Sequence, residues 1–288
     1  MRKQLTGLSF LLMLAGCASA PAPISMSSST AISGAEESSL LAAADATRDD
    51  GRFNEALQIY QQLLVEAPGM PPAQLGLGEC LLALGKPQEA KQLFQSLKSN
   101  AELHAAASQG EGLALLALGQ PEAAAVPLTD ATNANSTLWR SWNALGDVAD
   151  HRHQPEEALK LYDKALAINP NSAAIINNIG YSRLLSGDTA RAVESFHSAL
   201  AMDPRSETIR NNLRLAIAAD GKYTDAIVAT TRDQLPIVLN NVGYIAMQKG
   251  DVSTASAYFA RAMEASSSYA SVTAKNLELL KAQGTSAP

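Results

Sequence analysis

The feature that most constrains this chain is a 34-residue period. An alanine recurs at that spacing, at Ala56, Ala90, Ala124, Ala158, Ala192 and Ala226. A period of this length is typical of arrays of helical hairpins, in which each copy can bury its apolar face only against the next copy. The chain is also rich in alanine and leucine and poor in β-branched residues, which favours helix. We therefore expect an all-α solenoid.

The copy from 139 to 172 shows the pattern within one period most completely. Its characteristic positions are Trp142, Leu145, Gly146, Ala149, Ala158, Tyr162, Ala165 and Pro170. Gly146 and Ala158 are small because the two helices of one hairpin touch there, and Pro170 ends the second helix because its ring clashes with the preceding turn. This pattern resembles the tetratricopeptide repeat. The resemblance implies a superhelical solenoid of helix-turn-helix repeats that binds other proteins.

The repeats are expected to cover residues 37–269 as seven units. Their approximate bounds are 37–70, 71–104, 105–138, 139–172, 173–206, 207–240 and 236–269. The second helix of unit six should be short, with Leu235-Pro236 closing it early, and Pro127 in unit three should cause a kink or a late helix start. Residues 270–288 should form a C-terminal cap helix and tail that shields the end of the array from solvent.

The N-terminus has the layout of a secretory leader. Arg2 and Lys3 precede a ten-residue apolar run that is too short to span a bilayer, and the run ends in Leu14-Ala15-Gly16-Cys17. This ending resembles the lipobox of bacterial lipoproteins. The resemblance implies a signal peptide at 1–16, a lipid on Cys17 and a tether at 17–36 that is rich in serine and proline. The alternative is an ordinary leader cut after Ala18-Ser19-Ala20.

The residue after the acylated cysteine sets the expected membrane. Position 18 is alanine and not aspartate, so the inner-membrane retention signal of enterobacterial lipoproteins is absent. We therefore expect a lipid-anchored protein of the outer membrane that faces the periplasm. Several acyl chains would make such an anchor effectively permanent, since each buried methylene contributes about 0.8 kcal/mol.

No arrangement of residues in the sequence predicts catalysis, a metal or a cofactor other than the lipid. The four histidines have no metal-ligand spacing, and His151 and His153 fall in an expected turn. Cys80 lies in a helical context and is expected to be a small buried hydrophobe. The net charge of -6 argues against nucleic acid as a partner. We therefore expect a binding protein and not an enzyme.

Asparagines recur at one place in the later units and predict a partner-binding groove. They are Asn143 in unit four, Asn177 and Asn178 in unit five, Asn211 and Asn212 in unit six, and Asn240 and Asn241 in unit seven. Asparagine is unfavourable inside a helix, so its repetition in register needs a reason. Its amide can bind a peptide main chain, with Arg183, Arg210 and Arg214 favouring an acidic ligand. The alternative is an internal ladder that bridges adjacent repeats.

The combination of lipobox, repeats and C-terminal pattern narrows the expected function. The segment from Arg210 to Tyr223, followed by Leu235-Pro236 and a second Asn-Asn-Val-Gly-Tyr, resembles the repeat lipoprotein of tight-adherence (Flp) pilus systems. The resemblance implies a pilotin-like assembly factor with the outer-membrane secretin, or another pilus-assembly component, as its partner. Two alternatives stay open. One is another repeat lipoprotein, such as a type IV pilus pilotin or an adaptor for periplasmic cell-wall enzymes. The other is an accessory subunit of an enzyme or transport complex.

Overall fold

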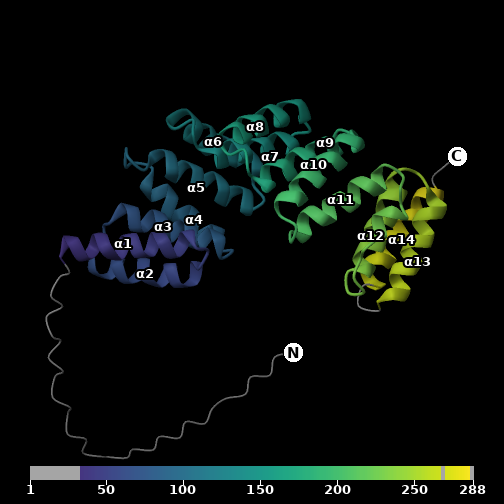
Figure 1. Ribbon diagram of the computed structural model, residues 1–288, viewed down its shortest axis with the longest axis horizontal. Helices are drawn as coiled ribbons and strands as arrows, with labels where there is room; N and C mark the ends of the chain where they lie inside the picture. The colour runs from purple at the N-terminus through teal and green to yellow at the C-terminus, as the bar shows by residue number, and fades with distance from the viewer. Residues whose placement is uncertain (1–32, 267–269, 286–288) are drawn as a thin grey trace, which may run out of the picture.

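The computed structural model describes residues 33–266 and 270–285, and this part of the chain is an array of antiparallel helix pairs. The pairs follow one another along an elongated arc from α1 to α14 (Figure 1). The first six helices are α1 (Gly34–Asp49), α2 (Phe53–Glu66), α3 (Pro71–Ala83), α4 (Pro87–Leu97), α5 (His104–Ala117) and α6 (Pro121–Ala134). The next five are α7 (Trp139–His151), α8 (Pro155–Ile168), α9 (Ala173–Leu185), α10 (Thr189–Met202) and α11 (Glu207–Ala219). The last elements are the short 3-10 helix η1 (Asp225–Ile227), α12 (Leu235–Gln248), α13 (Val252–Ala265) and α14 (Ala270–Thr285). The all-α solenoid predicted from the period is confirmed.

Each hairpin turns on a residue in the left-handed backbone conformation. Glycine fills this position in most hairpins, as at Gly85 and Gly119, because it lacks the Cβ that penalises positive φ. In unit four the position belongs to His153, with φ of 56°. His153 is therefore part of a solvent-exposed turn, as predicted, whereas His151 is the last residue of α7 and not part of that turn.

Within the hairpins of units two to five and unit seven, a glycine on the first helix contacts a large side chain of the second helix. A Cβ on Gly146 would lie 2.4 Å from the Tyr162 ring, and one on Gly180 would lie 2.8 Å from Phe196. Both of these aromatic side chains are almost completely buried. The predicted reason for the small residue, close contact of the two helices, is therefore confirmed at these positions.

Unit six departs from this plan because its second helix is reduced to the single turn η1. The expected shortening is confirmed, but the expectation that Leu235-Pro236 closes that helix is wrong. These two residues instead open α12, where the missing N–H of Pro236 costs nothing because first-turn N–H groups have no helical partner. Arg214 occupies the repeat position that glycine has in units two to five and in unit seven, and its guanidinium donates to the carbonyl of Ala229 in the loop after η1.

Unit three keeps a continuous second helix. Pro127 lies inside α6, which starts at Pro121 like its counterparts, so the late start expected there is not found. The lost N–H of Pro127 is tolerated because the surrounding residues, including the completely buried Leu128, hold the helix against α5. At the N-terminal end, α1 begins at Gly34, before the boundary expected at residue 37. Ser33 caps it reciprocally with Glu36.

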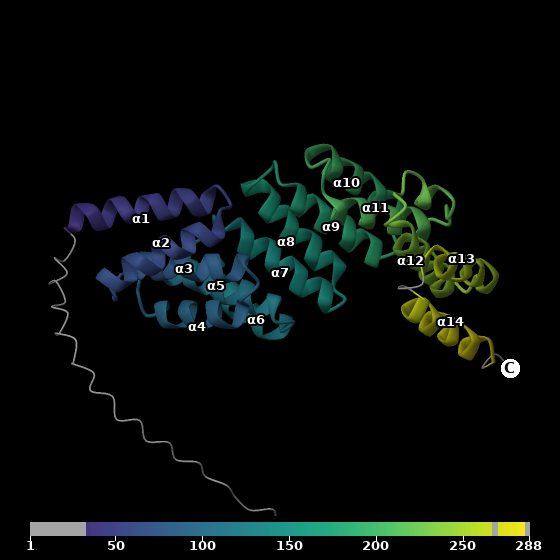
Figure 2. The same ribbon diagram turned by 90° about the horizontal axis from the view of Figure 1, so that it is seen from below.

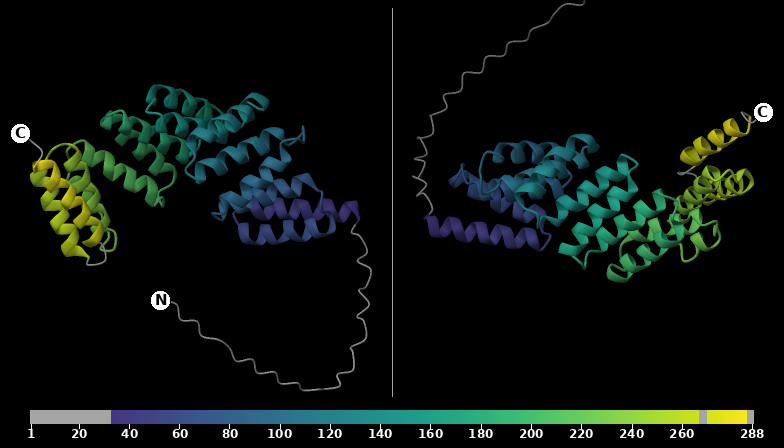
Figure 3. Two further views of the ribbon diagram at one scale, coloured as in Figure 1. Left: turned by 180° about the vertical axis from the view of Figure 1, so that it is seen from behind. Right: turned by 90° about the horizontal axis from the view of Figure 1, so that it is seen from above.

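The C-terminal helix α14 packs against α13 and also contacts α12 (Figure 2). Leu280 is buried there beside Phe259 and Ala246, so one face of α14 covers the end of the apolar core. The views in Figure 3 show α14 at the opposite end of the array from α1. No helix among the described residues combines the length and apolar character needed to cross a bilayer. The predicted signal peptide, Cys17 and most of the tether lie outside the described residues.

Two layers run along the array. The first helices of successive hairpins contact one another, as α5 does α7 and α7 does α9, whereas the second helices make no comparable contacts with each other in the described part of the chain. Helices that touch on one side and diverge on the other make a curved array, with the first helices on the inner side. We call the face formed by α1, α3, α5, α7, α9, α11 and α12 the inner face.

Candidate protein-binding surface

The predicted asparagines lie on the inner face, and part of the set forms a chain of hydrogen bonds. The Asn212 Nδ2 donates to Asn177 Oδ1 at 2.9 Å, Asn177 Nδ2 donates to Asn178 Oδ1 at 3.3 Å, and Asn178 Nδ2 donates to Asn143 Oδ1 at 3.1 Å. This chain joins α11, α9 and α7. The predicted alternative of bridging between repeats is therefore present in the structure.

At the C-terminal end the pattern resumes with different partners. The Asn276 Nδ2 of α14 donates to Asn240 Oδ1 at 3.0 Å, and Asn211 accepts a hydrogen bond from Arg214 at 3.0 Å. Asn241 lies beside Arg214 in a small depression between α11 and α12. An amide side chain has two N–H donors and an oxygen with two acceptor positions, so a single bridging bond leaves part of its capacity for a ligand.

The three predicted arginines occupy different environments. Arg183 donates to Ser195 Oγ at 2.7 Å, and Arg210 pairs with Glu207 in its own helix. Arg214 is only 6% exposed and has no carboxylate within ion-pair distance among the described residues. It donates to Asn211 and to the carbonyl of Ala229, and burial lowers its pKa. Its guanidinium thus supports the irregular loop of unit six.

Exposed apolar side chains next to the asparagine chain were missed by the sequence analysis. Tyr181 and Tyr244 are each 43% exposed, and Leu185 is 51% exposed. Tyr181 and Leu185 lie three and seven residues after Asn178 in α9, and Tyr244 lies three residues after Asn241 in α12. Residues three, four and seven apart share a helix face. Their repetition of the Asn-Asn-x-Gly-Tyr pattern was the signal that could have identified them.

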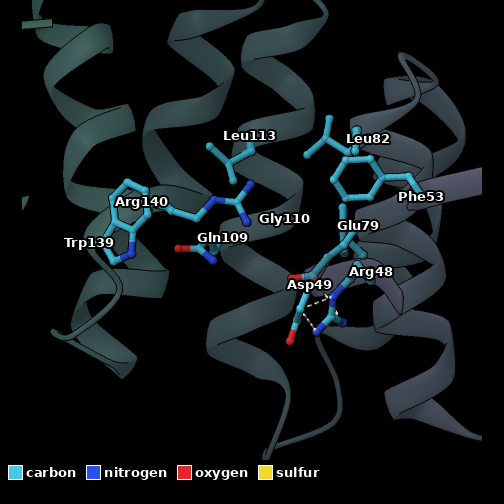
Figure 4. A pocket seen from close by; sticks show the side chains of 12 residues that line it. Arg48, Asp49, Phe53, Glu79, Leu82, Gln109, Gly110, Leu113, Trp139 and Arg140 are labelled. Atoms are coloured by element: carbon cyan, nitrogen blue, oxygen red, sulfur yellow. Dashed lines mark hydrogen bonds and ion pairs between the residues drawn. The ribbon is translucent and has the colours of Figure 1, made fainter. Parts of the chain in front are cut away.

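A further cavity lies toward the N-terminus, on the inner face of units one to four. It has a volume of about 530 Å³, and its polar lining includes Arg48, Glu79, Gln109 and Arg140. We call it the Arg48–Arg140 pocket. These residues come from α1, α3, α5 and α7, roughly one period apart in sequence, and Figure 4 shows them around a common space. The sequence analysis did not single them out, because none of them shares a motif with another.

Ion pairs fix one wall of this pocket. Arg48 contacts Glu79 at 2.9 Å, Asp45 at 3.1 Å and Asp49 at 3.0 Å, and also donates to the Tyr60 hydroxyl. Burial raises the pKa of Glu79, and the charges of Arg48 and Arg140 oppose that shift. Arg48 therefore holds three carboxylates in place with donors that are no longer available to a ligand.

The other side chains that could carry chemistry, Cys80 and Asp150, have structural roles. Cys80 is completely buried, and burial raises its pKa to about 11, as expected of an unreactive core thiol. The described residues contain no group of three or more side chains suited to hold a metal ion. Asp150, almost fully buried between units four and five, accepts hydrogen bonds from Tyr162 and Ser182 and therefore links the two units.

Comparison with solved structures shows the same architecture. A thermophilic tetratricopeptide repeat protein from Thermus thermophilus aligns with a TM-score of 0.55 and 22% identity, over 63% of this chain and 98% of its own. A tetratricopeptide repeat protein from Parabacteroides merdae aligns with a TM-score of 0.56 and 16% identity, over 86% and 100%. A chain of the APC/C hetero-tetramer Cut9-Hcn1 aligns with a TM-score of 0.60 and 16% identity, over 88% and 51%. At these identities the likeness concerns the fold alone.

Two protein families match the sequence of this chain. The family described as the cilia and flagella-associated protein 70 C-terminal domain matches residues 14–235, and a tetratricopeptide repeat family matches residues 237–269. No curated protein matches the sequence. The fold is one of protein-interaction scaffolds, and no enzyme family is indicated. The first match covers well over half of the sequence, so the chain belongs to that tetratricopeptide-repeat family, described as the cilia and flagella-associated protein 70 C-terminal domain.

Proposed function

We propose that this chain is an outer-membrane-anchored scaffold that faces the periplasm and assists assembly of the secretin of a tight-adherence pilus, without catalysis of its own. The anchor in this proposal is the lipid on Cys17, inferred from the lipobox resemblance. The pilus system is inferred from the C-terminal sequence pattern. Both are expectations from the sequence, and the repeat fold is compatible with them.

The observation that carries the binding part of the proposal is the juxtaposition of amide and aromatic side chains on the inner face of units four to seven. Asn178, Asn212 and Asn241 offer the donor and acceptor groups that a peptide main chain requires. Tyr181 and Tyr244 add exposed rings to the same face. Tyrosine combines a large apolar surface with a polar end and is enriched at protein interfaces.

In this arrangement the main chain of an extended secretin segment bonds to the amides, and its apolar side chains pack on the tyrosines. The bridging bonds between asparagines support the site, because they hold successive amides at a fixed spacing before the ligand arrives. Preorganisation of this kind reduces the entropy that binding must overcome. Arg183 takes no part in this arrangement, because its guanidinium donates to Ser195 Oγ and to the Arg191 carbonyl, both on the second helix α10.

The test is capture of secretin from solubilised membranes by immobilised protein. In one variant, Asn178, Asn212 and Asn241 all become alanine, and in a second, Tyr181 and Tyr244 become alanine. Each lost amide contact should weaken binding by about 0.5–1.5 kcal/mol, so the triple variant should bind at least about tenfold more weakly. The matched control replaces Val65 and Val126 by alanine, because both are exposed on second helices.

Thermal melting of every variant separates loss of a contact from loss of the fold. Full secretin capture by folded triple-asparagine and double-tyrosine variants would remove the site from this surface. Failure of the wild-type protein to capture secretin, with capture of a cell-wall enzyme or transport subunit instead, would replace the pilotin role by one of the alternatives.

A further inference from the structure

We propose that the Arg48–Arg140 pocket is a second docking site, which accepts an internal segment of a partner protein that carries one acidic and one basic side chain close together. The proposal rests on the chain's proposed function as a protein-binding scaffold. It concerns a different part of the inner face from the asparagine surface.

On one side of the pocket, N–H donors make no hydrogen bond to an acceptor of the described residues. Gln109 is only 7% exposed, and its Oε1 accepts a hydrogen bond at 3.1 Å from the Ser141 hydroxyl, which is completely buried. That bond fixes the orientation of the amide and directs its Nε2 into the pocket, where no hydrogen bond to the described residues is made (Figure 4). The Nε2 faces the pocket, so its N–H donors are available to a ligand that enters there.

Arg140 adds a positive charge on the same side. Its side chain extends from α7 into the pocket (Figure 4), and it has no carboxylate within ion-pair distance among the described residues. Gln109 and Arg140 come from successive first helices and together present donors suited to a carboxylate. A guanidinium with an amide N–H beside it binds a carboxylate through charge-assisted hydrogen bonds, which are stronger than neutral ones.

The opposite side offers acceptors. Glu79 uses Oε2 in its ion pair with Arg48, and its Oε1 makes no hydrogen bond within the described residues. Asp49 likewise uses Oδ1 for Arg48, and its side chain is 69% exposed. These spare oxygens are suited to a lysine or arginine of the partner. The Arg48 cluster fixes both carboxylates, so little side-chain entropy is lost when such a cation binds.

Because the pocket carries carboxylates on one side and a guanidinium on the other, it favours a peptide segment with both charges over one with a single charge. A purely anionic segment would place negative charge against Glu79 and Asp49, and a purely cationic one would meet Arg140. A segment with both charges satisfies the two walls at once. Apolar side chains of Phe53, Leu82 and Leu113 also line the space and can pack against the aliphatic parts of such a segment.

The test is an NMR titration of the purified full chain with short peptides whose ends are blocked by acetyl and amide groups. The dipolar probe is acetyl-Ala-Glu-Ala-Lys-Ala-amide. The comparison probes replace the glutamate by lysine, the lysine by glutamate, or both by glutamine. We expect the dipolar probe to perturb signals of Gln109 and Arg140 and to bind at least about fivefold more tightly than any comparison probe.

Two charge reversals supply the controls. Arg140→Glu should weaken binding of the dipolar probe about tenfold and should convert the pocket to a preference for the probe with two lysines. Lys275→Glu makes the same charge change at an exposed position of α14 and should leave all four affinities unchanged. Equal binding of the four probes to wild type, or unchanged preference in a folded Arg140→Glu variant, would overturn the proposal.

This experiment is independent of the secretin test. Loss of secretin capture in the asparagine and tyrosine variants leaves the pocket's peptide preference unaltered, because those residues lie in units five to seven. Conversely, an Arg140→Glu variant with unaltered probe preference that still captures secretin would refute the second site and leave the proposed function standing.

Discussion

Replacement of Asp150 by alanine should weaken the junction between units four and five more than any exposed substitution nearby. The Asp150 carboxylate accepts a hydrogen bond from the Tyr162 hydroxyl at 2.8 Å and another from the Ser182 hydroxyl at 2.7 Å. Asp150, Tyr162 and Ser182 are 5%, 1% and 0% exposed. Alanine removes both acceptors and leaves two buried hydroxyls without partners.

The magnitude follows from those two hydroxyls. Each orphaned buried donor costs about 1–3 kcal/mol, so the variant should lose roughly 2–5 kcal/mol of unfolding free energy after partial relief of carboxylate burial. For a chain of this size the melting temperature should fall by on the order of 10 °C. Asp147→Ala is the matched control, because it lies on the same helix with a side chain 45% exposed and should change melting little.

The pH dependence supplies a second readout. Burial raises the pKa of Asp150 above its usual value of 3.8, although the bonds from Ser182 and Tyr162 oppose the shift. The folded protein therefore holds this proton at a higher pH than the unfolded chain does. Its contribution to stability is complete below pH 3.8 and is lost as pH rises through the folded pKa. Asp150→Asn cannot titrate and should lack this component.

The assay measures thermal and urea unfolding by circular dichroism for wild type, Asp150→Ala, Asp150→Asn and Asp147→Ala. The measurements are repeated between about pH 3.5 and 7, a range that spans the titration of Asp150. Asp150→Asn should be less destabilised than Asp150→Ala, since the amide oxygen can still accept. If Asp150→Ala melted at the same temperature as wild type at neutral pH, this carboxylate would not join the two units.

Three further predictions concern the repeat register, the lipid anchor and the buried thiol. Ala158→Asp should destabilise the array by several kcal/mol, because it buries an unpaired charge at a completely buried helix contact; an unchanged melting curve would invalidate the repeat register. Cys17→Ser should abolish palmitate incorporation and release the protein from the outer membrane or leave an uncleaved precursor; absence of label on the wild type would exclude the lipid anchor. Cys80 should react with iodoacetamide only after unfolding, because burial raises its pKa to about 11 and shields the thiol; rapid reaction of folded protein at about pH 8 would contradict this environment.

Much of the fold could be predicted from the sequence because each repeat depends on local rules. The 34-residue period, the turn glycines and the small residues at helix contacts, such as Gly146, are all readable along the chain. Neighbouring repeats make the same contacts, so one well-formed unit predicts the others. The shortened second helix of unit six was also readable, since its period contracts before Ala255.

The tertiary structure decided what the side chains on the inner face do. The sequence placed the asparagines in register, but only the packing of α7, α9 and α11 shows that Asn143, Asn178 and Asn212 take part in one hydrogen-bonded chain. Arg214 likewise read as a groove residue, whereas the lost second helix leaves it buried against the unit-six loop.

The Arg48–Arg140 pocket depends on the tertiary structure most completely. Its polar residues come from four different repeats and share no motif, and their charges acquire meaning only when the curvature of the array brings α1, α3, α5 and α7 around one space. A repeat period determines which helix face each residue occupies, because that is a property of local geometry. Which residues of successive repeats meet across that face depends on the angles at which the hairpins stack, and those angles are set by packing between units.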